Sequence, residues 1–396
     1  MFILDFLKNQ EDKSATDDFI TCEYRLLCSG EIYSGDVLTT DWRMSDATRL
    51  ILVSPFTVIV SSHPFNDYPQ ELALRFTTGL VTEYRERSIS EFYPDEEIAR
   101  DIAALLCLFC RRLVTVSAKV REVYPRHYEG EPEVFQDWPI DFVNSLKTVS
   151  WERHPVNIVY GPDGVDEIID YNPKPKPVSR KLLKKLFLAL PHIPEAESII
   201  HSARLYALAL ERIDQDVDIA YHLLIESVET IANEVFRSFA PSESDMIKTK
   251  KTVADLATQF GLAREQADRL AVEACKGISW HNRKFVKFLT ENGGDELWTE
   301  DDVFVPYPRL MPKRDDFESA VEQIYRARGK VSHAGGAYPA SAGIGTRPRV
   351  STRAMDEAMD SVANSKKPFP PIIWFERAVN IALRQFVERA VEMSSK

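Results

Sequence analysis

Residues 198–239 read "SIIHSARLYALALERIDQDVDIAYHLLIESVETIANEVFRSF", and this stretch decides the fold class of the second half of the chain. Apolar residues recur in it at spacings of three and four, which is the period of an amphipathic α-helix. The pattern falls into two segments, at residues 198–213 and 217–239. The spacing therefore predicts two consecutive helices.

Helical patterns continue from there to the end of the chain. The periodic segments are "KKTVADLATQFG" (250–261), "AREQADRLAVEAC" (263–275), "DDFESAVEQIYRARGKVSH" (315–333) and "PPIIWFERAVNIALRQFVERAVEM" (370–393). Asp315 or Asp316 is a suitable N-cap for the third segment, and prolines open the last one. Residues 290–312 lack the pattern and are expected to form an irregular inserted loop. We expect an all-α region.

The first half has a different character. Short β-rich runs such as "LILVSPFTVIV" (50–60) and "LALRFTTGLV" (72–81) alternate with turn residues, which predicts strands. A helix is expected after Pro94, because acidic residues follow this proline and an apolar-periodic run leads to two arginines. The prolines of "DYNPKPKPVSRKLLKKL" (170–186) prevent regular structure. The expected fold class is therefore α+β, with a mixed α/β domain at residues 1–175 and a helical domain at residues 176–396.

Charge is distributed unevenly between these halves. The chain of 396 residues has a net charge of −12. Residues 1–173 hold 16 basic and 30 acidic side chains, a net −14, which leaves 33 basic against 31 acidic, or +2, for the remainder. The acidity thus belongs to the first half, and the helical half can still offer a local surface for phosphates.

Cellular location follows from what the sequence lacks. There is no basic leader with a cleavage site at the N-terminus and no apolar run near the roughly 18 residues of a membrane helix, so we expect a cytoplasmic protein without membrane contact. The five cysteines are scattered, which fits a reducing compartment. Cys107 and Cys110 form a C-x-x-C inside an apolar helical run. Without a second ligand pair at zinc-like spacing, we interpret them as buried core thiols.

The stretch most suggestive of chemistry is "YRARGKVSHAGG" (325–336), where two arginines, a lysine and a histidine gather at the end of a predicted helix. Cations at a helix C-terminus can simply complement its carbonyl groups. Together with "YALALERIDQDVDIAYHLLIESVETIANE" (206–234), however, "AVEQIYRARGKVSHAGG" (320–336) resembles the HEPN superfamily, particularly its Apea-like members. The first passage resembles that family's opening helix pair. The second resembles its third helix, which carries an R-x4-6-H motif.

The resemblance covers about residues 195–395 and implies a HEPN-like helical bundle, often a metal-independent endoribonuclease of anti-phage or toxin systems. It implies Arg328 and His333 as the catalytic pair, with Arg326 and Lys330 as substrate-binding residues. Gly329 departs from the family, which usually has a polar residue after the motif arginine, so activity is in question. The alternative is an inactive dimerisation and protein-interaction scaffold. No cofactor and no metal are expected.

These residue types suit cleavage of RNA by its own 2′-hydroxyl. Histidine can take or give a proton near neutral pH, and arginine can hold phosphate oxygens with its planar fork of donors. One chain offers one motif histidine, whereas the reaction needs an acid and a base. We therefore expect a homodimer with a composite site at a twofold interface, RNA as substrate, and a possible regulatory protein partner bound by the N-terminal domain.

Helix geometry leaves the choice of arginine open. At about 100° per residue, Arg326 and His333 return to one face, whereas Arg328 lies about 140° from His333. Gly329 is expected to weaken the last turn, so that the chain leaves the helix and Arg328 and His333 converge. Motif alignment favours Arg328.

Weaker candidates surround this motif. The basic, aromatic segment "GISWHNRKFVKF" (277–288) could bind RNA, but a core tryptophan beside a solvated helix face is the preferred interpretation. The lysines of the 170–186 linker are interpreted as a solvated face. Glu226 and Glu229 could orient the motif from a facing helix, although we favour an exposed stripe.

Overall fold

The computed structural model describes residues 3–4, 19–28, 51–53, 70–80, 94–111, 113–123, 156–160, 166–170, 180–213, 215–277, 280–299, 311–334, 336–343 and 369–394. Beyond residue 180 these form helices, as predicted, but a short helix at residues 296–299 lies within the stretch 290–312 that was expected to be irregular; residues 300–310 of that stretch lie outside the described ones. The helices are α5 (Arg180–Ala189), α6 (Ala196–Arg212), α7 (Val217–Val235), α8 (Glu243–Gln259), α9 (Arg264–Gly277), α10 (His281–Asn292), α11 (Glu296–Thr299), α12 (Phe317–Ala334) and α14 (Ile372–Ser394). Short 3-10 turns are η1 (Leu190–His192), η3 (Arg314–Asp316) and η4 (Ala340–Gly343).

The described residues before this region form a sheet, a hairpin and a helix. Strands β1 (Phe19–Cys28), β2 (Ile51–Val53), β3 (Gln70–Leu80) and β4 (Val114–Val123) make an antiparallel sheet in the order β2-β3-β1-β4. Strands β5 (Val156–Tyr160) and β6 (Asp166–Asp170) pair antiparallel. Helix α3 (Pro94–Cys110) begins at the proline that the sequence indicates.

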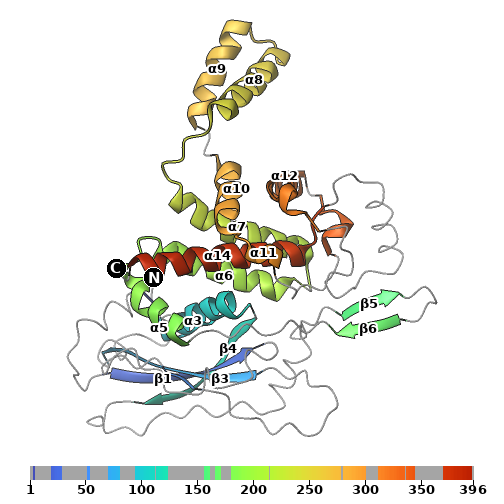
Figure 1. Cartoon of the computed structure of the whole chain (residues 1–396). Coiled ribbons are helices and arrows are strands. Elements are labelled where there is room, and N and C mark those ends of the chain that lie inside the picture. Colours follow the sequence, from blue (N-terminus) through green and yellow to red (C-terminus); the bar gives the residue numbers. More distant parts are fainter. Residues whose placement is uncertain are drawn as a thin grey trace.

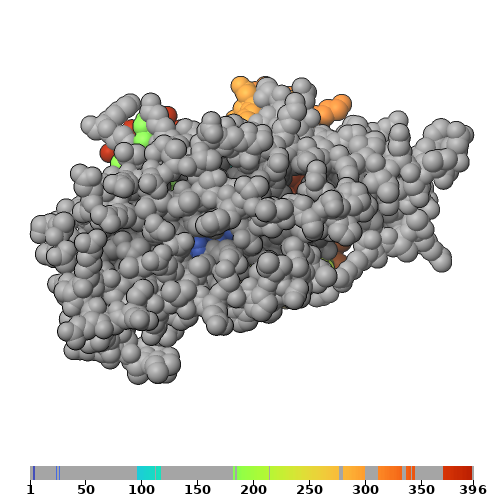
Figure 2. Space-filling model, turned by 90° about the horizontal axis from the view of Figure 1, so that it is seen from below, coloured from blue at the N-terminus to red at the C-terminus, as the bar shows by residue number. Residues whose placement is uncertain are grey.

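The helices and the sheet lie in layers (Figure 1). Helix α3 lies between the sheet and the layer formed by α6, α7 and α14, while the α8–α9 hairpin projects away from the rest of the molecule. From below, in Figure 2, blue N-terminal atoms are visible near the middle, and most of the green, orange and red atoms, which belong to the helical half, lie along the upper edge.

A single hydrophobic core connects α3 to the helical half. The same cluster of buried residues holds Leu26 of β1, most of α3, and the inner faces of α6, α7, α10 and α14. The Cys107 and Cys110 side chains are buried in it, which confirms the interpretation of core thiols, and the Cys107 thiol donates a hydrogen bond to the Val114 carbonyl at 3.2 Å. The division near residue 175 stays a prediction, but α3 packs with the helices that follow it.

Buried polar contacts fix the central helix α14. The Glu376 carboxylate accepts hydrogen bonds from the Tyr206 hydroxyl at 2.5 Å and from the Arg111 guanidinium at 2.8 Å. The Asn380 amide donates to the Leu108 carbonyl at 2.7 Å. Because buried polar groups are costly without partners, these bonds specify how α14 sits against α3 and α6.

Candidate functional site

Helix α12 carries the motif and is continuous through it. It runs unbroken from Phe317 to Ala334, across Gly329, where an added Cβ would meet no heavy atom within 4 Å apart from its chain neighbours and the nearby backbone of its own helix. The expectation that Gly329 lets the chain leave the helix before His333 is therefore wrong. A helix favours an unbroken ladder of backbone hydrogen bonds, and one glycine costs it only about 1 kcal/mol.

Continuity of α12 decides which motif positions share a face. Since about 100° separates successive residues, the backbone positions of Arg328 and His333 lie about 140° apart around the axis, whereas those of Arg326 and His333 nearly coincide. The His333 side chain itself lies outside the described residues. Within one chain, the backbone of α12 brings Arg326, and not Arg328, to the face of His333.

Arg328 is on the inner face of α12, against α7. Its guanidinium forms an ion pair with the Glu229 carboxylate at 2.7 Å, and the Glu226 carboxylate lies at 3.9 Å. The Tyr325 hydroxyl donates a hydrogen bond to the same Glu229 carboxylate at 2.5 Å. The Arg328 guanidinium also lies 5.7 Å from the centre of the Tyr325 ring. Glu229 thus joins α7 to two side chains of α12.

These contacts correct the interpretation of an exposed acidic stripe on α7 for Glu229, whereas Glu226 is exposed as expected. The Glu229 side chain is only 13% exposed, and the Glu226 side chain is 49% exposed. Glu229 lies under α12 because the helices pack there, and its charge is compensated by Arg328. Sequence periodicity alone does not reveal this pairing, since a carboxylate at the margin of an apolar face can point either way.

A histidine and a tyrosine that the sequence analysis did not single out lie beside Arg328. The His222 ring of α7 meets the Tyr338 ring edge-on, with 5.7 Å between ring centres. Burial lowers the pKa of His222, and the positive charge of Arg328 lowers it further. The Tyr338 hydroxyl is buried and has no hydrogen-bond partner among the described residues, and burial raises the pKa of this phenol. His222 is therefore biased toward its neutral form.

The sequence does contain a signal for the polar residues of α7 that lie near Arg328. Asp218, His222, Glu226 and Glu229 are spaced by four, four and three residues, which aligns them along one side of α7. The Tyr338 backbone N–H donates to the Asp218 carboxylate at 3.2 Å. A polar stripe along a largely buried helix indicates a polar neighbour, but the sequence does not say which one.

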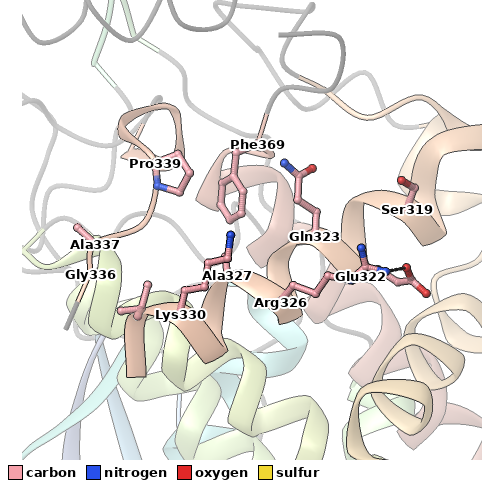
Figure 3. Close-up of a pocket in the computed structure, with 11 residues that line it drawn as sticks. Ser319, Glu322, Gln323, Arg326, Ala327, Lys330, Gly336, Ala337, Pro339 and Phe369 are labelled. Carbon is pink, nitrogen blue, oxygen red and sulfur yellow. Dashed lines mark hydrogen bonds and ion pairs between the residues drawn. The ribbon is translucent and has the colours of Figure 1, made fainter. Parts of the chain in front are cut away.

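The outer face of α12 borders a cavity of about 490 Å³. Arg326 and Lys330 line it, along with polar and apolar residues: Ser319, Glu322, Gln323, Ala327, Val331, Gly336, Ala337, Pro339 and Phe369. In Figure 3 the Gln323 and Lys330 side chains extend toward the space near Phe369, while Arg326 turns toward Glu322. The two residues predicted to bind substrate therefore border the same cavity.

A chain of ion pairs connects this cavity to the projecting hairpin. The Glu322 carboxylate binds the Arg326 guanidinium at 2.6 Å and the Arg283 guanidinium, also at 2.6 Å. Arg283 of α10 in turn binds the Asp245 carboxylate of α8 at 2.5 Å. Arg283 belongs to the basic, aromatic segment of the sequence analysis, and here it serves a structural contact. Lys330 differs, since no carboxylate of the described residues lies within ion-pair distance of its ammonium group.

The remaining candidates belong to segments of the chain other than α12. In the same basic segment, the Lys287 ammonium lies 4.8 Å from the centre of the Phe236 ring. Lys185 of the linker is exposed on α5, and Lys174 and Lys176 lie outside the described residues. Among the described residues, no group of three or more His, Cys, Asp or Glu side chains is placed to hold a metal ion.

Comparisons with known proteins leave the family open. The chain matches no protein-family model, no curated protein and no solved structure. Among the helices in the described part of the chain, none has the length and apolar character that crossing a lipid bilayer requires.

Proposed function

We propose that the chain is a metal-independent endoribonuclease of the HEPN type, in which the outer face of α12 meets the RNA. The observation that carries this proposal is the unbroken helix, which aligns Arg326, Lys330 and the backbone position of His333 along one face beside a cavity of about 490 Å³. The resemblance of residues 320–336 to the R-x4-6-H helix supports the choice of reaction. In this chain the six-residue spacing, Arg326 to His333, is the one that fits the helix.

The reaction is a transfer of a phosphoryl group within the RNA. The ribose 2′-oxygen attacks the adjacent phosphorus, the bond from phosphorus to the 5′-oxygen breaks, and the products are a 2′,3′-cyclic phosphate and a 5′-hydroxyl. A base takes the 2′-hydroxyl proton, and an acid protonates the departing 5′-oxygen. We assign proton transfer to His333, stabilisation of the charged phosphoryl oxygens to Arg326, and binding of a neighbouring phosphate of the strand to Lys330.

Arg328 has a separate role in this proposal. Its ion pair with Glu229 holds α12 against α7, and the Tyr325 hydroxyl reinforces the same contact. A helix anchored on its inner face presents its outer face in one orientation, which lowers the cost of ordering the site when RNA binds. Arg328 is thus a positioning residue. It lies on the inner face of α12, whereas the phosphate is proposed to bind at the outer face.

Two copies are proposed to share the reaction. A twofold contact along the outer face of α12 would bring a second His333 to the cleft and so supply both an acid and a base. The mixed N-terminal domain would sense a trigger or bind a regulatory protein, and a cytoplasmic role in anti-phage defence or as a toxin fits the resemblance. The helical half is proposed as the catalytic part.

The test is RNA cleavage by the purified full chain in the presence of EDTA. Wild-type protein and Lys248→Met, which changes an exposed lysine on α8, should both cleave. His333→Ala and Arg326→Met should lose cleavage by about 100-fold or more, since each removes a proton-transfer or charge-stabilising group. Light scattering confirms that all four proteins have the same oligomeric state. Cleavage by His333→Ala at the wild-type rate would overturn the proposal.

The scaffold remains a second candidate, because one specific observation favours it. The arginine at the family motif position, Arg328, is occupied by an intramolecular carboxylate. A scaffold predicts no cleavage by wild-type protein and full dimer formation by His333→Ala. The same experiment therefore separates the two functions.

A further inference from the structure

The cavity beside α12 combines the groups that a nucleotide needs. Its described lining offers one unpaired ammonium group, from Lys330, and one side-chain amide, from Gln323. Ala327, Val331 and Pro339 add apolar surface, and the Phe369 ring borders the same space. In a nucleotide, the phosphate binds a cation, the edge of the base binds hydrogen-bond donors and acceptors, and the face of the base packs against apolar surface.

We propose that this cavity binds one unpaired nucleotide of an RNA strand, with Lys330 on its phosphate and Gln323 on the edge of its base. The inference rests on the proposed function and names the kind of RNA that it acts on. A volume of about 490 Å³ lies within the usual range of small-ligand cavities, about 300–1,000 Å³. Turning a base out of a duplex costs its stacking and its pairing, so a base that is already unpaired enters such a space more easily. We therefore expect a single-stranded substrate.

Gln323 suits base recognition because its amide both donates and accepts. The Gln323 side chain extends into the cavity in Figure 3, one helical turn from Ala327 and two from Lys330. Positions 323, 327 and 330 follow one another at spacings of four and three, so they form a single stripe along α12. Lys330 and Gln323 of this stripe can therefore bind the phosphate and the base of one nucleotide.

Arg326 provides a second cation, which can bind a phosphate if it leaves its present carboxylate partner. In the structure it pairs with Glu322, which also binds Arg283. Glu322 retains Arg283 as a partner if Arg326 turns to a phosphate, so the exchange leaves no carboxylate without a cation. A strand that continues past the bound nucleotide meets Arg326 on the same face. Lys330 therefore anchors the nucleotide in the cavity, and Arg326 contacts the neighbouring phosphate.

The test measures binding separately from cleavage. The probe is a fluorescent single-stranded hexanucleotide with 2′-O-methyl groups, which removes the attacking hydroxyl and so prevents cleavage. Lys330→Met and Gln323→Leu keep helix-forming side chains of similar length. Each should weaken binding about five- to tenfold, the effect of one lost hydrogen bond to a charged or polar partner. The control Lys248→Met should bind as the wild type does.

Salt dependence separates the two roles. A contact to one phosphate of a single strand contributes about 0.7 to the slope of log affinity against log salt concentration. Lys330→Met should lower the slope by about that amount, whereas Gln323→Leu should leave it unchanged. The same oligonucleotide annealed to its complement should bind at least about tenfold more weakly, because its bases are paired.

Each failure has its own meaning. Unchanged affinity in both variants, or no binding of the hexanucleotide by wild-type protein, overturns the nucleotide site. If a free nucleoside 5′-monophosphate binds as tightly as the strand, the site serves a free nucleotide and the inference for RNA is wrong. If binding depends on Lys330 and Gln323 but unmethylated RNA is not cleaved, the site stands and the ribonuclease proposal fails. If RNA is cleaved but both variants bind as the wild type does, the ribonuclease proposal stands and the nucleotide site fails.

Discussion

The two arginines of the motif should differ sharply in what they do for stability. We compare Arg328→Met with Arg326→Met, which delete the guanidinium and keep a flexible apolar side chain in a helix. The two residues are two positions apart on α12, so local helix propensity affects both variants alike. The difference between them reports on their contacts.

The expected magnitudes follow from exposure. Arg328 is 26% exposed and its partner Glu229 is 13% exposed, so Arg328→Met leaves a largely buried carboxylate with the Tyr325 hydroxyl as its remaining short contact. A lost charge-assisted hydrogen bond in such a place costs about 1.5–3 kcal/mol. Arg326 is 66% exposed and pairs with Glu322 four residues away, a contact worth about 0.3–0.5 kcal/mol.

Chemical unfolding of the full chain, followed by circular dichroism, measures the difference. Arg328→Met should lower the free energy of unfolding by about 2 kcal/mol, and Arg326→Met by less than about 0.5 kcal/mol. RNA cleavage should rank the two in the opposite order, with Arg326→Met more damaging at a temperature where both are folded. Equal stability losses, or a greater loss in Arg326→Met, would refute the assignment of Arg328 to the inner face.

Three other predictions concern single residues. Gly329→Ala should stabilise the protein by about 0.5–1 kcal/mol in thermal unfolding, because position 329 is helical and has open space for a methyl group; destabilisation would mean that α12 is not a regular helix there. Burial and the hydrogen bond to Glu229 raise the pKa of Tyr325 in the folded protein. The contribution of Tyr325 to stability is therefore complete below about pH 10, the pKa of tyrosine in the unfolded chain, and it is lost as the pH rises above that value. Tyr325→Phe should therefore show a shallower loss of stability above about pH 10, and identical pH profiles would contradict this. Arg204→Met should cost about 3–5 kcal/mol, since Asp101 on α3 is fully buried and relies on that guanidinium; a loss below about 1 kcal/mol would mean that α3 is not docked on α6.

Much of the helical half could be predicted from the sequence. The apolar period of residues 198–239 indicated both α6 and α7, because a three-four spacing is a strong signal over that length. Pro94 correctly marked the start of α3. These features are local, and local periodicity and turn chemistry determine them.

The contacts of the candidate site could not be predicted in the same way. Whether Glu229 faces solvent or Arg328 depends on how α7 and α12 pack, and this packing joins residues about a hundred positions apart. Gly329 was expected to end the helix, but the surrounding turns of α12 override its weak preference. Phe369 and Tyr338 approach the site only through the fold, so no spacing within the motif indicates them.

The most direct measurement is the chemical nature of the RNA ends after incubation with the purified chain in EDTA, determined by mass spectrometry. The account predicts 2′,3′-cyclic phosphate and 5′-hydroxyl ends with wild-type protein, and no such ends with His333→Ala or Arg326→Met. Intact RNA, 5′-phosphate ends, or the same cyclic ends from His333→Ala would contradict the claim that the outer face of α12 carries the reaction.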